Sequence, residues 1–387
     1  MYNKAAVIGI GESVYYRQGR SPHSALQLTA TAVKNAIADA GLQPKDIDGL
    51  VTFMDTTHRA HANLASWFGF SNLHFAANPM SGGGNLGAAA VNLADAAVCA
   101  GYATNVVVYR GINQGEEGRY GRHRGPRIAE KEQAYNAPFG AAAPVTWNAL
   151  RTMKFMHTYG ITQDQLAEIA LADYAHAQRN PRAVMYGRPI TREEYHASRW
   201  ISEPFHLFDC CQENDGACAV VVTSADRAQD APQPAAYILA GASGMEAKGG
   251  LWAYNDSAWP NGRLRTVGTQ LWERSGVKPD DIDVAQFYEN FSGTTMQAIT
   301  DIGFCPPDGV GEFMSNGNLR WPGGKLPFNT AGGNIAEAYI HGFQLVPEAV
   351  RQIRGSSTCQ VPDVQLSLSV GGPGTPPSSA VLFAKAR

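Results

Sequence analysis

The chain has 387 residues, of which 44% are hydrophobic and 17% are charged, so it can bury a large core and form about two or three domain-sized units. Its formal net charge of −3 argues against a nucleic-acid or anionic-membrane partner bound by bulk electrostatics. No stretch approaches the roughly 20 apolar residues of a membrane span, and the short apolar run at the start lacks the features of a signal peptide. We therefore expect a soluble, cytoplasmic protein that has neither nucleic acid nor membrane as a partner.

The first predicted elements alternate between strands and helices. Residues 7–11 are an apolar run that ends in glycines, which indicates a strand. A helical pattern then ends at Gly41, a proline prevents its continuation, and an apolar run at 49–53 enters a sheet. A glycine-rich turn at 83–85 precedes an alanine-rich helix, and residues 105–111 predict another strand. This alternation indicates an α/β fold.

A long excursion at residues 112–205 separates this strand from an apolar run at 219–222, which closes the first half of the chain. The beginning of the excursion, residues 115–127, is polar and rich in Gly and Arg, which predicts an exposed loop. Residues 162–178 carry apolar side chains at helical spacing. Because an insertion on one half commonly covers a binding site, we expect residues 112–205 to form a lid.

An internal duplication sets the predicted architecture. The pattern G-x-x-P-x-D-I-D occurs at 41–48 and again at 276–283, a spacing of 235 residues (276 minus 41). Its repeated aspartates indicate a structural turn rather than paired catalytic carboxylates. The first strand, the glycine-rich turn and the closing strand have counterparts in the same order, at 238–242, 332–335 and 380–383. We therefore expect two homologous halves, residues 1–230 with the insertion 112–205, and residues 231–387.

The cysteines give no sign of a metal site or a disulfide framework. None forms a CxxC pair, and none lies near histidines at metal-ligand spacing. We therefore expect no metal and no cofactor bound by this chain, and reduced, mostly buried thiols. The six residues are Cys99, Cys210, Cys211, Cys218, Cys305 and Cys359.

Two fused α/β halves with an inserted segment resemble the thiolase superfamily. The strings around Asn180 and Tyr195 resemble the loop domain of thiolases of the sterol-carrier type, and residues 208–217 resemble the segment that closes their first half. The resemblance covers essentially the whole chain. It implies the thiolase fold, two duplicated halves in a five-layer αβαβα arrangement with an inserted loop domain, and an active site at the ends of four loops between the halves.

The four expected site loops depart from the thiolase pattern. The first carries a serine where thiolases carry the nucleophilic cysteine, the second and third each carry a tyrosine, and the fourth is rich in glycine. This pattern resembles the side-chain-cleaving aldolases of bacterial steroid degradation, which release a short acyl-CoA without a cysteine nucleophile. The residues expected at the site are Tyr288 and Tyr339 as catalytic groups, with Ser81, Asn290, His341, Gly371 and Gly372 as substrate-binding or oxyanion groups.

The resemblance also implies a substrate and partners. The substrate would be a β-hydroxyacyl-CoA with a steroid side chain, which brings coenzyme A as part of the substrate. Cleavage would give a ketone and a short acyl-CoA such as propionyl-CoA. A homodimer is expected, extended by a companion protein with a zinc ribbon and an OB-fold into a heterotetramer.

The chemistry of a retro-aldol cleavage fits two tyrosines. A base must take the proton of the β-hydroxyl, and an acid must protonate the carbanion that leaves on the thioester. We assign Tyr288 to the hydroxyl and Tyr339 to the enolate carbon, with backbone N–H groups at Gly371 and Gly372 facing the thioester oxygen.

Other interpretations remain open at this point. Ser81 is favoured as a helix cap over a nucleophile, and His341 either orients Tyr339, binds substrate or is structural. Claisen-type cleavage with Ser81 or water as acyl acceptor is a second function. A non-catalytic acyl-CoA-binding or lipid-binding protein is a third.

Overall fold

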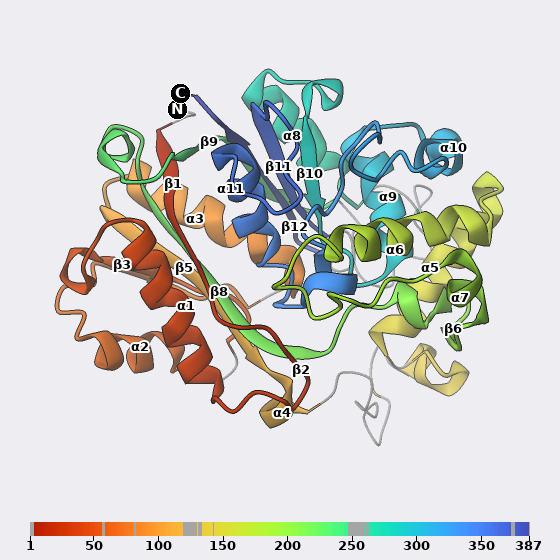
Figure 1. The fold of residues 1–387 in the computed structure, drawn as a ribbon, viewed down its shortest axis with the longest axis horizontal. Helices are drawn as coiled ribbons and strands as arrows, with labels where there is room; N and C mark the ends of the chain where they lie inside the picture. The colour runs from red at the N-terminus through yellow and green to blue at the C-terminus, as the bar shows by residue number, and fades with distance from the viewer. Residues whose placement is uncertain are drawn as a thin grey trace.

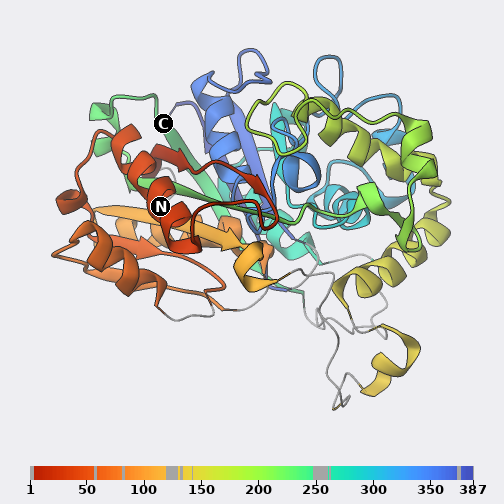
Figure 2. The same ribbon diagram turned by 60° about the horizontal axis from the view of Figure 1, so that its bottom comes forward.

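The computed structural model describes residues 4–55, 59–80, 83–118, 130, 134–141, 143–246, 260, 263–372 and 376–386 (Figures 1 and 2). The strands are β1 (Ala5–Glu12), β2 (Tyr16–Arg17), β3 (Gly49–Val51), β4 (Phe75–Ala77), β5 (Asn105–Asn113), β6 (Trp200–Ser202), β7 (Phe205–His206), β8 (Asn214–Ser224), β9 (Ala236–Gly244), β10 (Val284–Phe287), β11 (Leu366–Gly371) and β12 (Ser378–Ala384). The helices are α1 (Ala25–Asp39), α2 (Ala60–Phe68), α3 (Gly87–Cys99), α4 (Gln114–Glu117), α5 (Pro144–Tyr159), α6 (Gln163–Ala177), α7 (Arg192–Ala197), α8 (Arg265–Ser275), α9 (Ser292–Ile302), α10 (Val310–Met314) and α11 (Leu345–Arg354).

Both halves contribute strands to one sheet in the described part of the chain. Its order is β10-β11-β12-β9-β1-β8-β5-β3-β4, with β2 paired to β8. The two halves join where β1 meets β9, through the pairs Ala6 with Tyr237 and Val7 with Ala236. Equivalent strands have equivalent registers, because Gly49 pairs with Val106 in the first half and Val284 pairs with Ser367 in the second.

Helices cover the strands in layers. α1 packs on β1, β5 and β8 of the first half, and α8 packs on β9 and β12 of the second. α3 and α11 each contact strands of both halves and therefore form the layer between them (Figure 1). This arrangement confirms the predicted α/β fold, with the central helical layer that the resemblance to thiolases implies.

The repeated aspartates are structural in both halves, as predicted. Asp46 accepts a hydrogen bond from the N–H of Gln43 at 2.8 Å, and Asp281 accepts the equivalent bond from Lys278 at 2.9 Å. The second aspartate of each copy caps the start of a neighbouring strand. Asp48 accepts from the N–H of Asn105 at 2.8 Å, and Asp283 accepts from Leu366 at 2.9 Å.

The two glycine-rich turns lead into different structures. In the first half the turn runs directly into α3 at Gly87. In the second half residues Gly333–Glu337 form a single wide turn, Ala338 is extended with φ −167°, and α11 begins at Leu345. The second turn is therefore not followed directly by a helix as the first one is. This break leaves residues 338–344 outside a helix, and it is this segment that carries two of the expected site residues.

The insertion contains the helix predicted at 162–178, which is α6, together with α5 and α7. These helices gather at one end of the molecule, away from α1 and α2 (Figures 1 and 2). α6 packs against the wide turn Gly333–Glu337. The polar loop predicted at 115–127 lies outside the described residues from position 119 onward.

The prediction of mostly buried cysteines is confirmed in part. All six lie in the described residues as free thiols: Cys218 and Cys359 are buried, and Cys210, Cys211 and Cys305 are partly buried. Cys99 is exposed because it ends α3 at the surface. Among the described residues, no helix is both long and apolar enough to cross a membrane.

Candidate active site

The side chains of Tyr288 and Tyr339 meet between the halves. Their phenol oxygens lie 2.8 Å apart, at hydrogen-bond distance, and the ring centroids lie 6.2 Å apart. The two side chains are 4% and 6% exposed, and they pack with Leu345 and Cys211. A phenol in so dry a place needs a polar partner, and each tyrosine serves as a partner of the other.

Each tyrosine is held by its backbone at the end of an element. Tyr288 directly follows β10, and its N–H donates to the carbonyl of Val370 on β11 at 2.8 Å. Tyr339 lies in the break before α11, and its N–H donates to Oδ1 of Asn214 at 2.6 Å. Because β8 begins at Asn214, a residue of the first half fixes a tyrosine of the second.

The first glycine-rich loop reaches the same place. A Cβ added to Gly84 would lie 2.2 Å from Cε2 of Tyr288 and 2.7 Å from the carbonyl oxygen of His341. Any side chain at this position would displace the Tyr288 ring. The glycine at 84 is therefore required for the first and third loops to close around the tyrosine pair.

His341 is held as a neutral imidazole beside the pair. Its ring lies edge-on to that of Tyr339, with centroids 5.4 Å apart. Nε and Nη2 of Arg110 donate to its Nδ1 at 3.2 and 3.0 Å. Because an arginine can only donate, Nδ1 is an acceptor and the imidazole proton lies on Nε2. Burial and then the Arg110 charge hold the pKa of His341 well below its usual value.

The backbone of His341 is in the left-handed region, with φ 49°. Such a conformation costs free energy in a residue with a side chain, and it persists only where the surrounding structure enforces it. Here it turns the chain so that Tyr339 and His341 face the same place. The tertiary contact with Arg110 is one of the forces that hold it.

A buried carboxyl pair lies behind Tyr288. Glu289 accepts hydrogen bonds from the N–H groups of Asn334 and Ile335, the second at 3.3 Å. Its neighbour Asp173 belongs to α6 of the insertion. Burial raises the pKa of Glu289 to about 8, and burial together with the Glu289 charge raises the pKa of Asp173 well above its usual value. The pair therefore retains a proton at neutral pH and joins the second loop, the third loop and the insertion.

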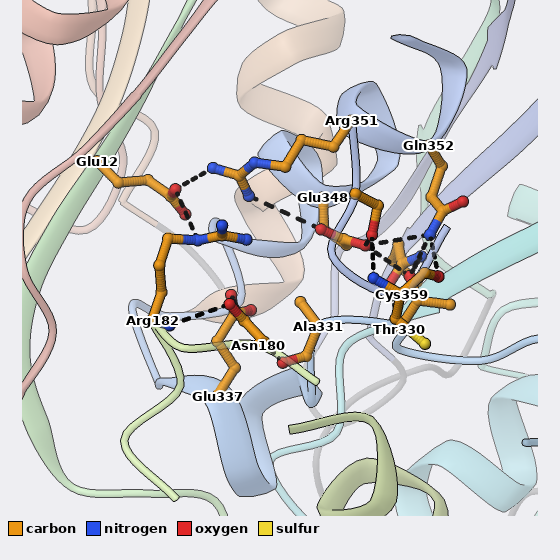
Figure 3. Close-up of polar contacts among 12 residues, drawn as sticks. Glu12, Asn180, Arg182, Thr330, Ala331, Glu337, Glu348, Arg351, Gln352 and Cys359 are labelled. Atoms are coloured by element: carbon orange, nitrogen blue, oxygen red, sulfur yellow. Dashed lines mark hydrogen bonds and ion pairs between the residues drawn. The ribbon is translucent and has the colours of Figure 1, made fainter. Parts of the chain in front are cut away.

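A buried network of ion pairs and hydrogen bonds lies around Glu337, two residues before Tyr339 in the chain (Figure 3). Glu12 of β1 is held by Arg351 of α11 and by Nε of Arg182 in the insertion, the latter at 3.5 Å. Glu337 accepts from Nδ2 of Asn180 at 2.9 Å. Burial raises the pKa of Glu337 well above its usual value. These contacts fix the insertion against both halves beside the segment that carries Tyr339.

The remaining expected site residues occupy the same loops. Oδ1 of Asn290, a half-buried residue, accepts from Oγ1 of Thr294 at 3.1 Å at the start of α9. Gly371 ends β11 and pairs with Ser379, while Gly372 follows the strand with φ 115°. Ser81 lies outside the described residues.

Cys211 is the thiol next to the tyrosine pair. Its N–H donates to the carbonyl of Asn290 at 3.0 Å. Burial, followed by nearby negative charge, raises the pKa of this thiol well above its usual value, so Cys211 is protonated and a poor nucleophile. Among the described residues, no group of three His, Cys, Asp or Glu side chains could hold a metal ion.

Sequence reasoning missed four residues at the site: Arg110, Asp173, Cys211 and Glu289. Two of them carry a signal that could have identified them. Arg110 is a charged residue inside the apolar strand β5, and Glu289 is a fully buried carboxylate directly after a site tyrosine. Asp173 lies on a buried helix face with no local pattern to distinguish it.

Comparisons with known proteins agree with this fold. A family described as thiolase C-terminal domain-like matches residues 253–384. The chain is 40% identical over 388 aligned residues to the steroid side-chain-cleaving aldolase of Thermomonospora curvata, with 98% of each chain covered. It is 38% identical to the 17-hydroxy-3-oxo-4-pregnene-20-carboxyl-CoA lyase of Mycobacterium tuberculosis, with 98% of this chain and 99% of the lyase covered.

A solved structure is similarly close. The Ltp2-ChsH2(DUF35) aldolase superposes with a TM-score of 0.91 at 39% identity, covering 99% of this chain and 98% of that one. An acetyl-CoA acetyltransferase from Syntrophomonas wolfei, at 14% identity and a TM-score of 0.71, shares the fold. The fold and the layout of the loops therefore define a member of the thiolase superfamily. Within it, the chain belongs to the family of the steroid side-chain-cleaving aldolase of Thermomonospora curvata.

Proposed function

We propose that this protein is an acyl-CoA retro-aldolase, which cleaves a β-hydroxyacyl-CoA with a steroid side chain into a ketone and a short acyl-CoA such as propionyl-CoA. The observation that carries this proposal is the contact of 2.8 Å between the buried phenols of Tyr288 and Tyr339. Two proton-transfer groups in one dry site match a reaction that removes one proton and delivers one. The names and full-length similarity of the relatives support the same reaction class.

The proposed reaction conserves protons. Tyr288, which acts as a phenolate hydrogen-bonded to the Tyr339 phenol, takes the proton of the β-hydroxyl and becomes a neutral phenol. The bond between the α- and β-carbons breaks, and the ketone leaves with its carbonyl oxygen. The electron pair of that bond becomes the enolate of the thioester, and Tyr339 protonates its α-carbon. The hydrogen bond between the phenols then allows the proton to return from Tyr288 to Tyr339, because a donor beside a phenolate stabilises it.

The site supports cleavage without a covalent intermediate. The thiol beside the tyrosines, Cys211, is kept protonated by the raised pKa that its burial causes. A retro-aldol reaction needs no nucleophile, whereas Claisen-type cleavage needs an acyl acceptor such as Ser81 or water. The two reactions differ in their products, and a mass spectrum separates them.

The test is incubation with a steroid β-hydroxyacyl-CoA whose hydroxyl is at the junction of ring and side chain. We expect a ketosteroid and a short acyl-CoA from the wild type and neither product from Tyr288→Phe or Tyr339→Phe. Detection of an acyl-enzyme on Ser81 would contradict the retro-aldolase proposal and support Claisen-type cleavage. Binding without products from any β-hydroxyacyl-CoA would indicate a non-catalytic acyl-CoA-binding protein.

The proposed assembly is a homodimer joined through β4. This strand forms one edge of the described sheet, and an edge strand offers backbone groups to a second copy. An exposed aromatic side chain lies beside it, since Tyr102 is 65% exposed and stacks on Phe75. A second exposed aromatic residue, Trp67 of α2, is 55% exposed. Light scattering should give a dimer that Tyr102→Glu with Trp67→Glu converts into a monomer.

We also propose a companion protein with a zinc ribbon and an OB-fold, which extends the dimer to a heterotetramer. The support is the close similarity to one chain of a structure described as an Ltp2-ChsH2(DUF35) aldolase. Coexpression with such a protein and size measurement of the purified complex test this assembly. The two thiolase halves at 1–230 and 231–387, the lid role of 112–205 and a cytoplasmic location belong to the same proposal.

A further inference from the structure

Two buried polar atoms at the end of β11 have no hydrogen-bond partner within the described residues. They are Nδ2 of Asn85 and Oγ of Ser378, and each residue is only 2% exposed. Both atoms face one point, because a Cβ built on Gly372 would lie 3.4 Å from Nδ2 and 2.7 Å from Oγ. Buried polar groups are normally paired, so two unpaired ones around one point indicate a place for a polar ligand atom.

The duplication shows how this donor became available. Asn334 is the counterpart of Asn85 in the second glycine-rich turn, and its Nδ2 donates to Oε2 of Glu289 at 3.3 Å. The residue that corresponds to Glu289 in the first half, at the spacing of 235 residues (289 minus 54), is Met54. A methionine offers no carboxylate to the amide. The same asparagine is therefore satisfied within the protein in one half and unsatisfied in the other.

These donors belong to loops that reach the tyrosine pair. Asn85 directly follows Gly84, whose position is in contact with the Tyr288 ring, and Gly372 lies two residues after Val370, which accepts the backbone hydrogen bond of Tyr288. We propose that the side-chain amide of Asn85 and the hydroxyl of Ser378 bind the carbonyl oxygen of the acyl-CoA thioester. This inference rests on the proposed function and assigns two donors for the oxygen that gains negative charge as the enolate forms.

The chemistry of the two groups matches a thioester oxygen. Nδ2 of an amide can only donate, and a hydroxyl can donate beside it. Two neutral donors fixed in a dry site stabilise an oxygen that is neutral in the substrate and negative in the enolate, without needing to reorganise. Both are held independently of the ligand, since Ser379 donates to the carbonyl of Asn85 and β12 begins at Ser378.

The test compares binding of an acyl-CoA thioester with that of the matching S-alkyl-CoA thioether, in which a CH2 group replaces the carbonyl. We expect the full-length wild type to bind the thioester about tenfold more tightly, as measured by calorimetry, because the thioether leaves the two donors unpaired. Asn85→Ala should bring the two affinities within about threefold of each other, and Ser378→Ala should reduce the preference partially. In turnover, Asn85→Ala should lower kcat about 10²-fold to 10³-fold with little change in KM.

A matched control is Asn92→Ala on α3, the helix that follows the turn with Asn85. Nδ2 of Asn92 donates to the carbonyls of Ala242 and Ala380, both at 3.1 Å, so its loss should lower the melting temperature and leave the thioester preference intact. Asn85→Ala should not lower the melting temperature in the same way, because Nδ2 has no partner to lose. If that variant does not fold, Ser378→Ala, which removes one atom, takes its place.

The outcomes separate this inference from the proposed function. A thioester preference that Asn85→Ala abolishes, in a protein that cleaves no β-hydroxyacyl-CoA, would support the oxygen site and remove the retro-aldolase. The oxygen site would be overturned if the wild type cleaves the substrate and both variants keep its preference for the thioester. It would also be overturned if the wild type shows no preference for the thioester over the thioether.

Discussion

The phenol oxygen of Tyr288 lies 2.8 Å from the phenol oxygen of Tyr339, and these two residues come from loops 51 positions apart in the chain. Both rings are almost fully buried, so the hydrogen bond is stronger than it would be in water. One loop is fixed by β11 and the other by Asn214 of the first half. The distance between the phenols therefore depends on how the two halves pack.

Replacing either tyrosine by phenylalanine should abolish most of the activity. Each change removes one proton-transfer group, which is worth about 10²-fold to 10⁴-fold in rate. Because the two groups act as a unit, the double variant should be little worse than either single one. The measurement is single-turnover cleavage followed by mass spectrometry, with melting temperatures as the folding check. If the rate losses of the two single variants multiply in the double variant, the two tyrosines act independently.

Replacing Arg110 by methionine should alter the pH dependence of activity. Arg110 contributes to the lowered pKa of His341, so its loss should move that pKa upward, although burial still holds it down. Protonation of His341 would then add charge beside Tyr339 as the pH falls. We expect kcat/KM to decline on the acid side at a higher pH than in the wild type. Arg110→Lys, which keeps a positive donor, should suppress this shift, and identical profiles for all three proteins would contradict the assignment.

Replacing Glu289 by glutamine should make stability less dependent on pH. The pKa of Glu289 is raised from 4.5 to about 8, so the folded state holds a proton that the unfolded state has lost. The stabilisation that this proton contributes is therefore fully present below pH 4.5, the pKa of the unfolded state. It is lost as the pH rises toward about 8, the pKa of the folded state. Urea unfolding of Glu289→Gln should show a slope shallower by about 1 kcal/mol per pH unit across this range.

The control for this measurement is Glu273→Gln at an exposed position of α8. It should leave the slope of the unfolding free energy against pH unchanged, since a solvated carboxyl is little affected by folding. Equal slopes for the wild type and Glu289→Gln would show that the carboxyl pair with Asp173 does not hold a proton in the folded state.

Breaking the ion pair between Glu12 and Arg351 should destabilise the protein strongly. Burial raises the pKa of Glu12, but Arg351 and Arg182 together hold it below its usual value, so this contribution is lost as the pH falls. Arg351→Met leaves a buried carboxylate and should cost about 3–5 kcal/mol of unfolding free energy. Chemical denaturation measures it.

An exposed ion pair supplies the comparison for this experiment. Asp164, whose side chain is 64% exposed, pairs with Arg192 at 3.4 Å. Asp164→Asn should cost no more than about 1 kcal/mol, because water screens the pair. If Arg351→Met lowers the free energy of unfolding by no more than Asp164→Asn does, water also screens the ion pairs of Glu12.

Short-range patterns in the sequence determined the architecture. The repeated G-x-x-P-x-D-I-D turns, the glycine-rich turns and the strand runs are local features, and they predict two related halves because both copies encode the same local structure. The resemblance to thiolases, and not the repeat, predicts Tyr288, Tyr339 and His341 as residues of the site loops. It did not reveal that the second glycine-rich turn stops after Glu337, since the break depends on contacts that Glu289 makes with that turn.

Tertiary structure alone decided what surrounds these residues. The hydrogen bonds between Arg110 and His341 join residues 231 positions apart, and the contact between Asn334 and Glu289 spans 45. The first contact joins the two halves and the second joins two loops of one half, so neither is recorded in a local pattern. The buried, unpaired amide of Asn85 is a property of the same kind. Its residue type is visible in the sequence, but its lack of a partner depends on which side chain the other strands bring next to it.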